Sequence, residues 1–152
     1  MTTYKGIWFI GLAGSGKTFA SKYISKKMSN TFVLDGDEVR KYISTDLGYE
    51  LKDRSVQINR LFGIAKIILK NNYIPIISSV YMNNIISGQL DLEGIALIKI
   101  ERDYEDLVKI RKIYKKDKNV IGKDLDIENI FCKKIFNNGT EDFIHKINDI
   151  IK

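Results

Sequence analysis

Glycine, lysine and threonine recur near the start of the chain at a spacing that binds phosphate. The segment is Gly11-Leu-Ala-Gly-Ser-Gly-Lys-Thr18, which matches the P-loop pattern G-x-x-x-x-G-K-[ST]. In this pattern the backbone N–H groups of a glycine-rich loop converge on phosphate oxygens, and the N-terminus of the next helix adds partial positive charge. The segment therefore predicts a nucleoside triphosphate site rather than an ordinary glycine turn. The residues assigned to it are Gly11, Ala13, Gly14, Ser15, Gly16, Lys17 and Thr18.

Within this loop, Lys17 is expected to bridge the β- and γ-phosphates, and the Thr18 hydroxyl is expected to bind Mg²⁺. Two carboxylates, Asp35 and Asp37, follow the next apolar run at a distance of two residues. Asp35 could hold a water molecule bound to Mg²⁺, and Asp37 could orient an attacking hydroxyl and accept its proton. The alternative is a turn in which an aspartate only caps a short helix.

Several cations and one aromatic residue have the right chemistry for a second substrate. Arg40 lies one helical turn after Asp37 and is expected to reach an acceptor phosphate. Tyr49 follows in a loop and could stack on a base, although such an aromatic more often belongs to the core or to the rim of a site. Other candidates for charge neutralisation, each with the alternative of a plain surface charge, are Arg54, Arg60, Arg111 and the lysines near 115.

The elements that must position these residues alternate between strand and helix patterns. Apolar runs predict strands at 6–10, 31–35, 74–78, 95–100 and 131–136. Helices are predicted at 18–28, 36–42, 51–71, 103–113 and 140–150, with Asp53 and Thr140 as caps. Residues 82–89 are ambiguous, and Gly88 is expected to close a short helix there. Alternating elements predict an α/β fold with a parallel sheet and right-handed crossovers.

Ligands of such a sheet bind beyond the carboxyl ends of its strands. The P-loop, the segment from Asp35 to Asp37 and the serine pair Ser78-Ser79 are therefore expected to share one crevice. A lysine-rich stretch, 111–126, has little apolar periodicity. It is either a solvated surface or a mobile lid over the phosphate site, and the pattern alone does not decide between the two.

The overall composition is that of a globular protein. The chain has 152 residues, which suggests one domain, with 44% hydrophobic and 29% charged residues. Because the chain has one cysteine, Cys132, it cannot form an intrachain disulfide. The sequence has no apolar run long enough to predict a membrane segment and no pattern of a secretory leader. A cytoplasmic location is therefore expected. The net charge of +6 is spread along the chain, which favours a nucleotide substrate over nucleic acid.

Taken together, these motifs resemble the adenylylsulfate (APS) kinase family. The specific part is Leu34-Asp-Gly-Asp-Glu-Val-Arg40, Asp46-Leu-Gly-Tyr49 and Asp53-Arg54, at family spacing after the P-loop. A weaker match is Ile113-Tyr-Lys-Lys116 followed by Asn119-Val-Ile-Gly122, which looks like the family's lid. The resemblance extends from about residue 7 to about residue 124.

The resemblance implies a P-loop kinase fold, a five-stranded parallel sheet flanked by helices on both faces, in a single domain, 1–152. It also implies a reaction, in which the γ-phosphoryl of Mg-ATP passes to the ribose 3′-hydroxyl of a nucleotide. Asp37 and Lys17 would then be catalytic, and Thr18 and Asp35 would hold Mg²⁺. The acceptor would contact Asp37, Arg40, Tyr49, Arg54, Gln57 and Ser78, under a lid that carries Arg111, Lys115 and Lys116. Family members are often dimers, so a homodimer is one expectation.

Departures from the family pattern fall on the acceptor side. The family usually has phenylalanine in the place of Tyr49 and asparagine in the place of Gln57. Val120 replaces what is often a second aromatic over the base. The segment after the third strand is Ser78-Ser-Val-Tyr81, where the family has Ser-Pro-aromatic-Arg. In the lid, Arg111-Lys112 replaces a Lys-Gly, and the lid itself is several residues shorter. Two acceptors therefore stay open, adenylylsulfate and the cytidine nucleotide CDP-phosphoramidate, which some relatives phosphorylate in bacterial capsule modification.

Two other functional classes are weaker. A P-loop GTPase is disfavoured because the chain has no N-K-x-D base-reading motif. A non-catalytic nucleotide- or nucleic-acid-binding module is disfavoured because Lys17, Thr18, Asp35 and Asp37 are all retained.

Overall fold

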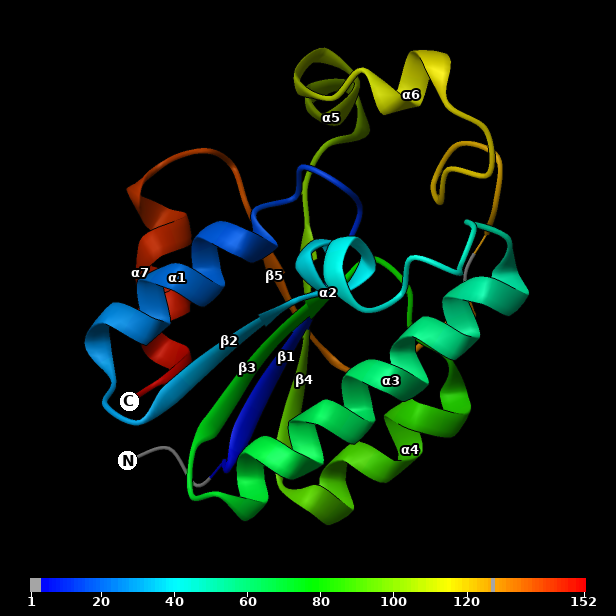
Figure 1. The fold of residues 1–152 in the computed structure, drawn as a ribbon. Helices are drawn as coiled ribbons and strands as arrows, with labels where there is room; N and C mark the ends of the chain where they lie inside the picture. Colours follow the sequence, from blue (N-terminus) through cyan, green and yellow to red (C-terminus); the bar gives the residue numbers. More distant parts are fainter. Residues whose placement is uncertain (1–3, 127) are drawn as a thin grey trace.

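A single parallel sheet forms the centre of the molecule (Figure 1). The computed structural model describes residues 4–126 and 128–152. Within these ranges the sheet has five strands in the order β2-β3-β1-β4-β5, and every neighbouring pair is parallel. Their bounds are β1 Gly6–Ile10, β2 Thr31–Asp35, β3 Ile74–Ser79, β4 Ile95–Glu101 and β5 Lys133–Phe136. The predicted five-stranded α/β fold is therefore confirmed.

Helices cover both faces of this sheet. Their bounds are α1 Lys17–Lys27, α2 Gly36–Tyr42, α3 Leu51–Lys70, α4 Asn84–Glu93, α5 Tyr104–Ile110, α6 Ile113–Lys116 and α7 Glu141–Ile150. Alternate residues of a strand point to opposite faces, and β1 shows the consequence. Ile7 and Phe9 join a core with α1 and α7, while Trp8 and Ile10 join a core with α3 and α4. Because both faces are buried, the central strands are nearly all apolar, as the sequence indicated.

Four local predictions differ from the structure. The fifth strand begins at Lys133 rather than at 131, because pairing with β4 starts there and Phe131 is fully exposed. Gly88 lies inside α4, and Gly94, whose φ of 74° is left-handed, ends that helix instead. Asp53 does not cap α3, which starts after Glu50. The single helix predicted at 103–113 is divided into α5 and α6 because Arg111 has extended backbone angles.

Other local predictions are confirmed. The Thr140 hydroxyl accepts a hydrogen bond from the N–H of Asp142 at 3.3 Å and so caps α7. The long helix predicted after residue 51 is α3, and its buried face packs on the sheet. None of the helices in the described residues combines the length and the apolar character needed to cross a bilayer.

Candidate active site

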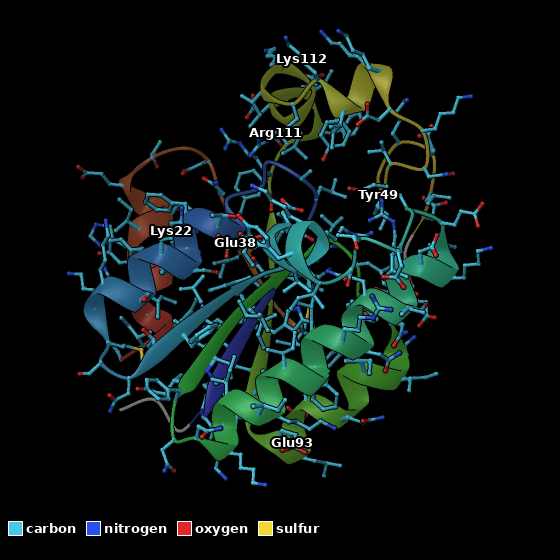
Figure 2. All side chains as sticks on the ribbon, viewed as in Figure 1. Lys22, Glu38, Tyr49, Glu93, Arg111 and Lys112 are labelled. Atoms are coloured by element: carbon cyan, nitrogen blue, oxygen red, sulfur yellow. The ribbon has the colours of Figure 1, made fainter. Side chains whose placement is uncertain are left out.

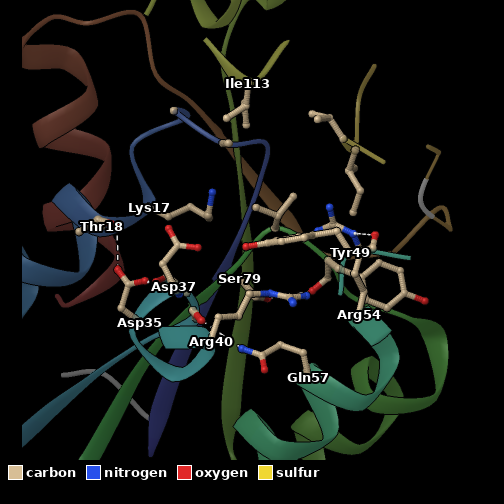
Figure 3. A pocket seen from close by; sticks show the side chains of 18 of the residues that line it. Lys17, Thr18, Asp35, Asp37, Arg40, Tyr49, Arg54, Gln57, Ser79 and Ile113 are labelled. Atoms are coloured by element: carbon tan, nitrogen blue, oxygen red, sulfur yellow. Dashed lines mark hydrogen bonds between the residues drawn. The ribbon is translucent and has the colours of Figure 1, made fainter. Parts of the chain in front are cut away.

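A cavity of about 700 Å³ lies at the edge of the sheet where β1, β2 and β3 end (Figure 3). The loops after these three strands all contribute to it, as expected for a parallel α/β sheet. The segment after α5 lies across the cavity from them. The charged lining residues are Lys17, Asp35, Asp37, Arg40, Arg54, Arg111, Asp117 and Lys118, and the aromatic ones are Phe19, Tyr49 and Tyr81; Thr18 lines the cavity as well.

The P-loop connects β1 to α1, and its glycines are required by its shape. Gly11 has a φ of 155°, and a Cβ atom there would lie 2.4 Å from the carbonyl oxygen of Ile100. No side chain fits at that distance, so only glycine allows the loop to pass so close to β4. Gly14 and Gly16 also have positive φ angles, 87° and 113°.

Lys17 begins α1 and lies over the loop. Its Nζ donates to the carbonyl oxygens of Gly11 and Leu12 at 2.8 and 3.0 Å. Burial lowers the pKa of Lys17 to about 8, although the carboxylates of Asp37 and Asp35 act in the opposite direction. The ammonium group is thus held among oxygen atoms beside the loop, where a phosphate would meet it.

Thr18 and Asp35 form a hydroxyl–carboxylate pair. The Thr18 hydroxyl donates to Asp35 Oδ2 at 2.9 Å, while Asp35 Oδ1 accepts from the N–H of Asp37 at 2.9 Å. Asp35 therefore does cap α2, and it also faces Thr18. Among the described residues no three His, Cys, Asp or Glu side chains gather as a metal cluster. Mg²⁺ commonly uses one or two carboxylates with substrate phosphates and water, so this pair fits that ion.

The residues predicted to bind an acceptor gather around Tyr49. The Arg40 guanidinium lies 4.4 Å from the centre of the Tyr49 ring and donates to the carbonyl oxygen of Gly48 at 2.6 Å. The Arg54 guanidinium lies 5.5 Å from the same ring and donates to the carbonyl oxygens of Tyr49 and Asn119. Burial and the nearby Arg40 lower the pKa of Arg54. Two arginines therefore support one exposed aromatic ring, which suits an anionic, planar ligand.

Gln57 and Ser78 also lie in the cavity wall. Gln57 is buried, and its Nε2 donates to the carbonyl oxygen of Gly36 at 3.0 Å. Within the described part of the chain, its Oε1 has no hydrogen-bond partner. Ser78 is buried at the end of β3, whereas the Ser79 hydroxyl is engaged by Trp8 and by the carbonyl oxygen of Tyr81.

Three cations predicted for the site do not line it. Lys115 and Lys116 are exposed on α6 and are absent from the cavity wall, which Lys118 joins instead. Arg60 pairs with Asp46 through two contacts of 2.7 and 2.8 Å, and this hydrogen-bonded pairing holds the pKa of Asp46 at about 2. Arg111 is in the wall: a Cβ atom on Gly14 would lie 2.9 Å from its Cγ. Figure 2 shows Arg111 nearer the P-loop than Lys112, which lies at the outer edge.

Two residues that hold the P-loop were not predicted. The Tyr114 hydroxyl donates to the carbonyl oxygen of Ala13 at 2.7 Å, and Asn137 Nδ2 donates to that of Ser15 at 2.7 Å. Tyr114 stands in the segment that resembles the family's lid, so the motif offered a signal for it. Asn137 lies outside every motif in the sequence.

Comparison with known proteins agrees with this geometry. The family model described as adenylylsulphate kinase matches residues 4–84, more than half of the chain. The chain belongs to the adenylylsulphate kinase family. The adenylyl-sulfate kinase of Staphylococcus epidermidis is 42% identical over 67 residues, covering 41% of this chain and 34% of that protein. The enzyme of the same name from Pseudomonas aeruginosa is 38% identical over 78 residues, covering 49% of this chain and 40% of that protein.

The fold agrees with solved members of the adenylylsulphate kinase family. The Mycobacterium tuberculosis APS kinase CysC, solved in complex with AMPPNP and APS, superimposes with a TM-score of 0.82 at 19% identity. That comparison covers 99% of this chain and 97% of the other. The sequence matches, by contrast, span less than half the length of the curated relatives.

Proposed function

We propose that this chain is an ATP-dependent kinase that transfers the γ-phosphoryl group of Mg-ATP to the ribose 3′-hydroxyl of a nucleotide. The observation that carries the proposal is that one cavity is lined by a P-loop half, which suits phosphates, and by an arginine-and-aromatic half, which suits an anionic, planar ligand. Lys17 and Thr18 belong to the first half, and Arg40, Tyr49 and Arg54 belong to the second. Asp37 lines the cavity together with both groups, where a hydroxyl of the acceptor would approach (Figure 3).

The chemistry required of these residues is mainly positioning and charge neutralisation. The hydroxyl oxygen of the acceptor bonds to the γ-phosphorus while the Asp37 carboxylate accepts the hydroxyl proton. The bond from that phosphorus to the β–γ bridging oxygen breaks, and ADP leaves with the bridging oxygen. Lys17 and the loop N–H groups stabilise the negative charge on the phosphates. Mg²⁺, when bound by Thr18 and Asp35 with the nucleotide, supplies further neutralisation.

Adenylylsulfate is the first candidate acceptor because the chain belongs to the adenylylsulphate kinase family. CDP-phosphoramidate is the second, and one observation favours it. Val120, which stands where the family often has a second aromatic over the base, is buried against Tyr114 and Leu107. Tyr49, in contrast, is exposed beside Arg40 and Arg54. Stacking contributes about 1–3 kcal/mol per base, so a clamp with one aromatic face suits a smaller pyrimidine.

The test is transfer of label from [γ-³²P]ATP to a panel of acceptors, resolved by chromatography. The panel contains adenylylsulfate, CDP-phosphoramidate, plain CDP and small alcohols. We expect one of the first two nucleotides to be labelled and the alcohols to stay unlabelled. If the label appeared only as inorganic phosphate, released by hydrolysis of ATP, and no acceptor were labelled, a nucleotide kinase would be contradicted.

Assembly is a separate expectation. We infer a homo-oligomer, with a homodimer as the simplest form; a solved relative is described as the hexameric APS kinase from Thiobacillus denitrificans. Light scattering coupled to size exclusion measures the mass directly, and a mass of one chain would contradict this inference.

A further inference from the structure

Asn137 is a buried polar residue that contacts the P-loop from across the sheet. It follows β5 directly, and only 5% of it is exposed. Its Nδ2 donates to the carbonyl oxygen of Ser15 at 2.7 Å, across 122 residues of sequence. Its Oδ1 accepts from the N–H of Gly139 at 2.9 Å, and its own N–H donates to the carbonyl oxygen of Glu101 at 2.8 Å. The Asn137 side chain is therefore fixed at both of its polar atoms.

The bond to Ser15 sets the orientation of one peptide group of the loop. The peptide bond between Ser15 and Gly16 is trans, and in a trans peptide the C=O and the following N–H point in opposite directions. Because Asn137 holds the Ser15 carbonyl oxygen on its own side, the Gly16 N–H points away from Asn137. Gly16 lines the cavity together with Lys17 and Thr18, whereas Asn137 is not among the residues that line it.

Packing around Gly16 keeps this peptide group where it is. A Cβ atom on Gly16 would lie 2.7 Å from Asn137 Nδ2 and 3.2 Å from the Phe143 ring. Ser15 is itself 1% exposed, and its N–H donates to the carbonyl oxygen of Leu12 at 3.0 Å. The loop is thus packed closely against Asn137 and Phe143 at Gly16, where a side chain would not fit.

We propose that Asn137 is a positioning residue for phosphate binding, which acts by holding the Ser15 carbonyl so that the Gly16 N–H faces the phosphates. The inference rests on the proposed function, because it requires that the loop binds a nucleoside triphosphate. Backbone N–H groups bind phosphate only when they converge on it, so loss of this anchor weakens nucleotide binding without touching the acceptor side.

The experiment compares two substitutions that add the same charge one residue apart. Asn137→Asp keeps the oxygen that accepts from Gly139 but replaces the donor to Ser15 with a carboxylate oxygen. Asn138→Asp is the matched control, because Asn138 is exposed and, within the residues that the structure describes, hydrogen-bonds only through its Oδ1, which accepts from Thr140. Affinity for Mg-AMPPNP is measured by calorimetry, and thermal unfolding without nucleotide measures the fold.

We expect Asn137→Asp to weaken Mg-AMPPNP binding by about tenfold or more, on the scale of a lost buried hydrogen bond. In turnover, the KM for ATP rises and the KM for the acceptor stays within about twofold, since the mutated contact touches only the loop. Asn138→Asp binds as the unchanged chain does. Equal affinity of Asn137→Asp and Asn138→Asp would overturn the proposal, as would a lower Tm with unchanged affinity.

Two further measurements cover the remaining outcomes. If Asn137→Asp does not fold, Asn137→Ala removes the donor without adding charge, and the same loss of affinity is expected. If neither folds, the amide resonance of Gly16 in the unchanged chain must shift on adding Mg-AMPPNP, and an unshifted resonance overturns the proposal. Failure of the unchanged chain to bind Mg-AMPPNP would instead refute the proposed function itself, and with it this inference.

Discussion

Two carboxylates two residues apart have different surroundings. Both oxygens of Asp35 are engaged, one by Thr18 and one by the N–H of Asp37. Among the described residues the Asp37 carboxylate has no hydrogen-bond partner, although it lines the same cavity. Because its carboxylate has no hydrogen-bond partner within the described residues, we predict that Asp37 accepts the proton of a substrate while Asp35 positions other groups.

Replacing Asp37 with asparagine tests this division. The amide keeps the size of the side chain but cannot accept the proton, so phosphoryl transfer should fall by about 10²–10⁴-fold, as for loss of a general base. Binding of Mg-AMPPNP should change little. The measurement is single-turnover transfer from labelled ATP. An unchanged rate would mean that Asp37 has no catalytic role.

The pKa of Lys17 predicts a pH dependence of nucleotide binding. Burial lowers this pKa to about 8 in the free chain, and the protonated form is the one that attracts phosphate. Affinity for Mg-AMPPNP should therefore fall above about pH 8, approaching about tenfold per pH unit. Lys17→Arg, which stays charged, should bind more weakly but without this fall. If the affinity of the unchanged chain for Mg-AMPPNP did not change with pH, the assignment of Lys17 to phosphate binding would be contradicted.

The lowered pKa of Lys17 also makes folding stability depend on pH, in the opposite direction to nucleotide binding. The unfolded chain holds the Lys17 proton up to its ordinary pKa of 10.5, so the unfolded state binds more protons between about pH 8 and 10.5. The contribution of Lys17 to the stability of the free chain therefore rises with pH in that window, while nucleotide binding weakens.

At the scale of elements, the segment after α5 is tied to both halves of the cavity. Tyr114 on α6 donates to Ala13 of the P-loop, and Arg54 on α3 donates to Asn119. Leu12 of the P-loop packs with Val120 and Tyr114. Burial raises the pKa of Tyr114 to about 12, so its hydroxyl remains a donor at any working pH. These contacts join the P-loop half and the arginine-and-aromatic half of the cavity through one short segment.

Tyr114→Phe tests the contact with the P-loop. The change removes only the hydroxyl, which leaves the Ala13 carbonyl oxygen without its donor at a cost of about 1–3 kcal/mol. The KM for ATP should rise by about fivefold or more. Tyr104→Phe is the control, because Tyr104 packs edge-on against Tyr114 and is 43% exposed. Equal KM values for the two variants would contradict a role for the hydroxyl.

At the scale of the whole molecule, the site depends on a sheet that is packed on both faces. Leu61 of α3 is fully buried against the sheet, and Ile67 of the same helix is 62% exposed. The two residues therefore separate the contribution of the core from that of helix propensity.

Leu61→Ala should lower the free energy of unfolding by about 2–5 kcal/mol, because it removes buried methyl groups and leaves a cavity. Ile67→Ala should change it by less than about 1 kcal/mol, as an exposed substitution in the same helix. Urea titration followed by the fluorescence of Trp8, which is buried, measures both. Equal losses in the two variants would contradict the assignment of α3 to the core.

Much of the fold could be predicted from the sequence because its signals are local. The alternation of apolar runs and helical patterns placed β1 to β4 and α3 within a few residues. The errors came where a local signal competes with packing. Gly88 tolerates a helix interior, Glu50 rather than Asp53 precedes the first turn of α3, and β5 starts only where β4 offers a partner.

The candidate site divides in the same way. The phosphate loop, Asp35, Asp37, Arg40, Tyr49 and Arg54 were predicted because short spacings encode them. The structure brings all of these to one cavity except Gly11, Leu12 and Ser15 of the loop, which do not line it. Their catalytic and binding roles stay predictions. Lys115 and Lys116 were placed with them by motif, but the sequence does not determine which way a short helix turns its lysines, and these two are exposed.

The sequence by itself determined that a P-loop starts a parallel α/β kinase fold, because a strand, a glycine loop and a helix follow one another within a few residues. Only the tertiary structure decided what holds that loop. The carbonyl oxygens of Ala13 and Ser15 are fixed by Tyr114 and Asn137, 101 and 122 residues away along the chain. The direction of a peptide group depends on the donor that meets its carbonyl, and no local spacing encodes a donor that the fold brings from the far end of the chain.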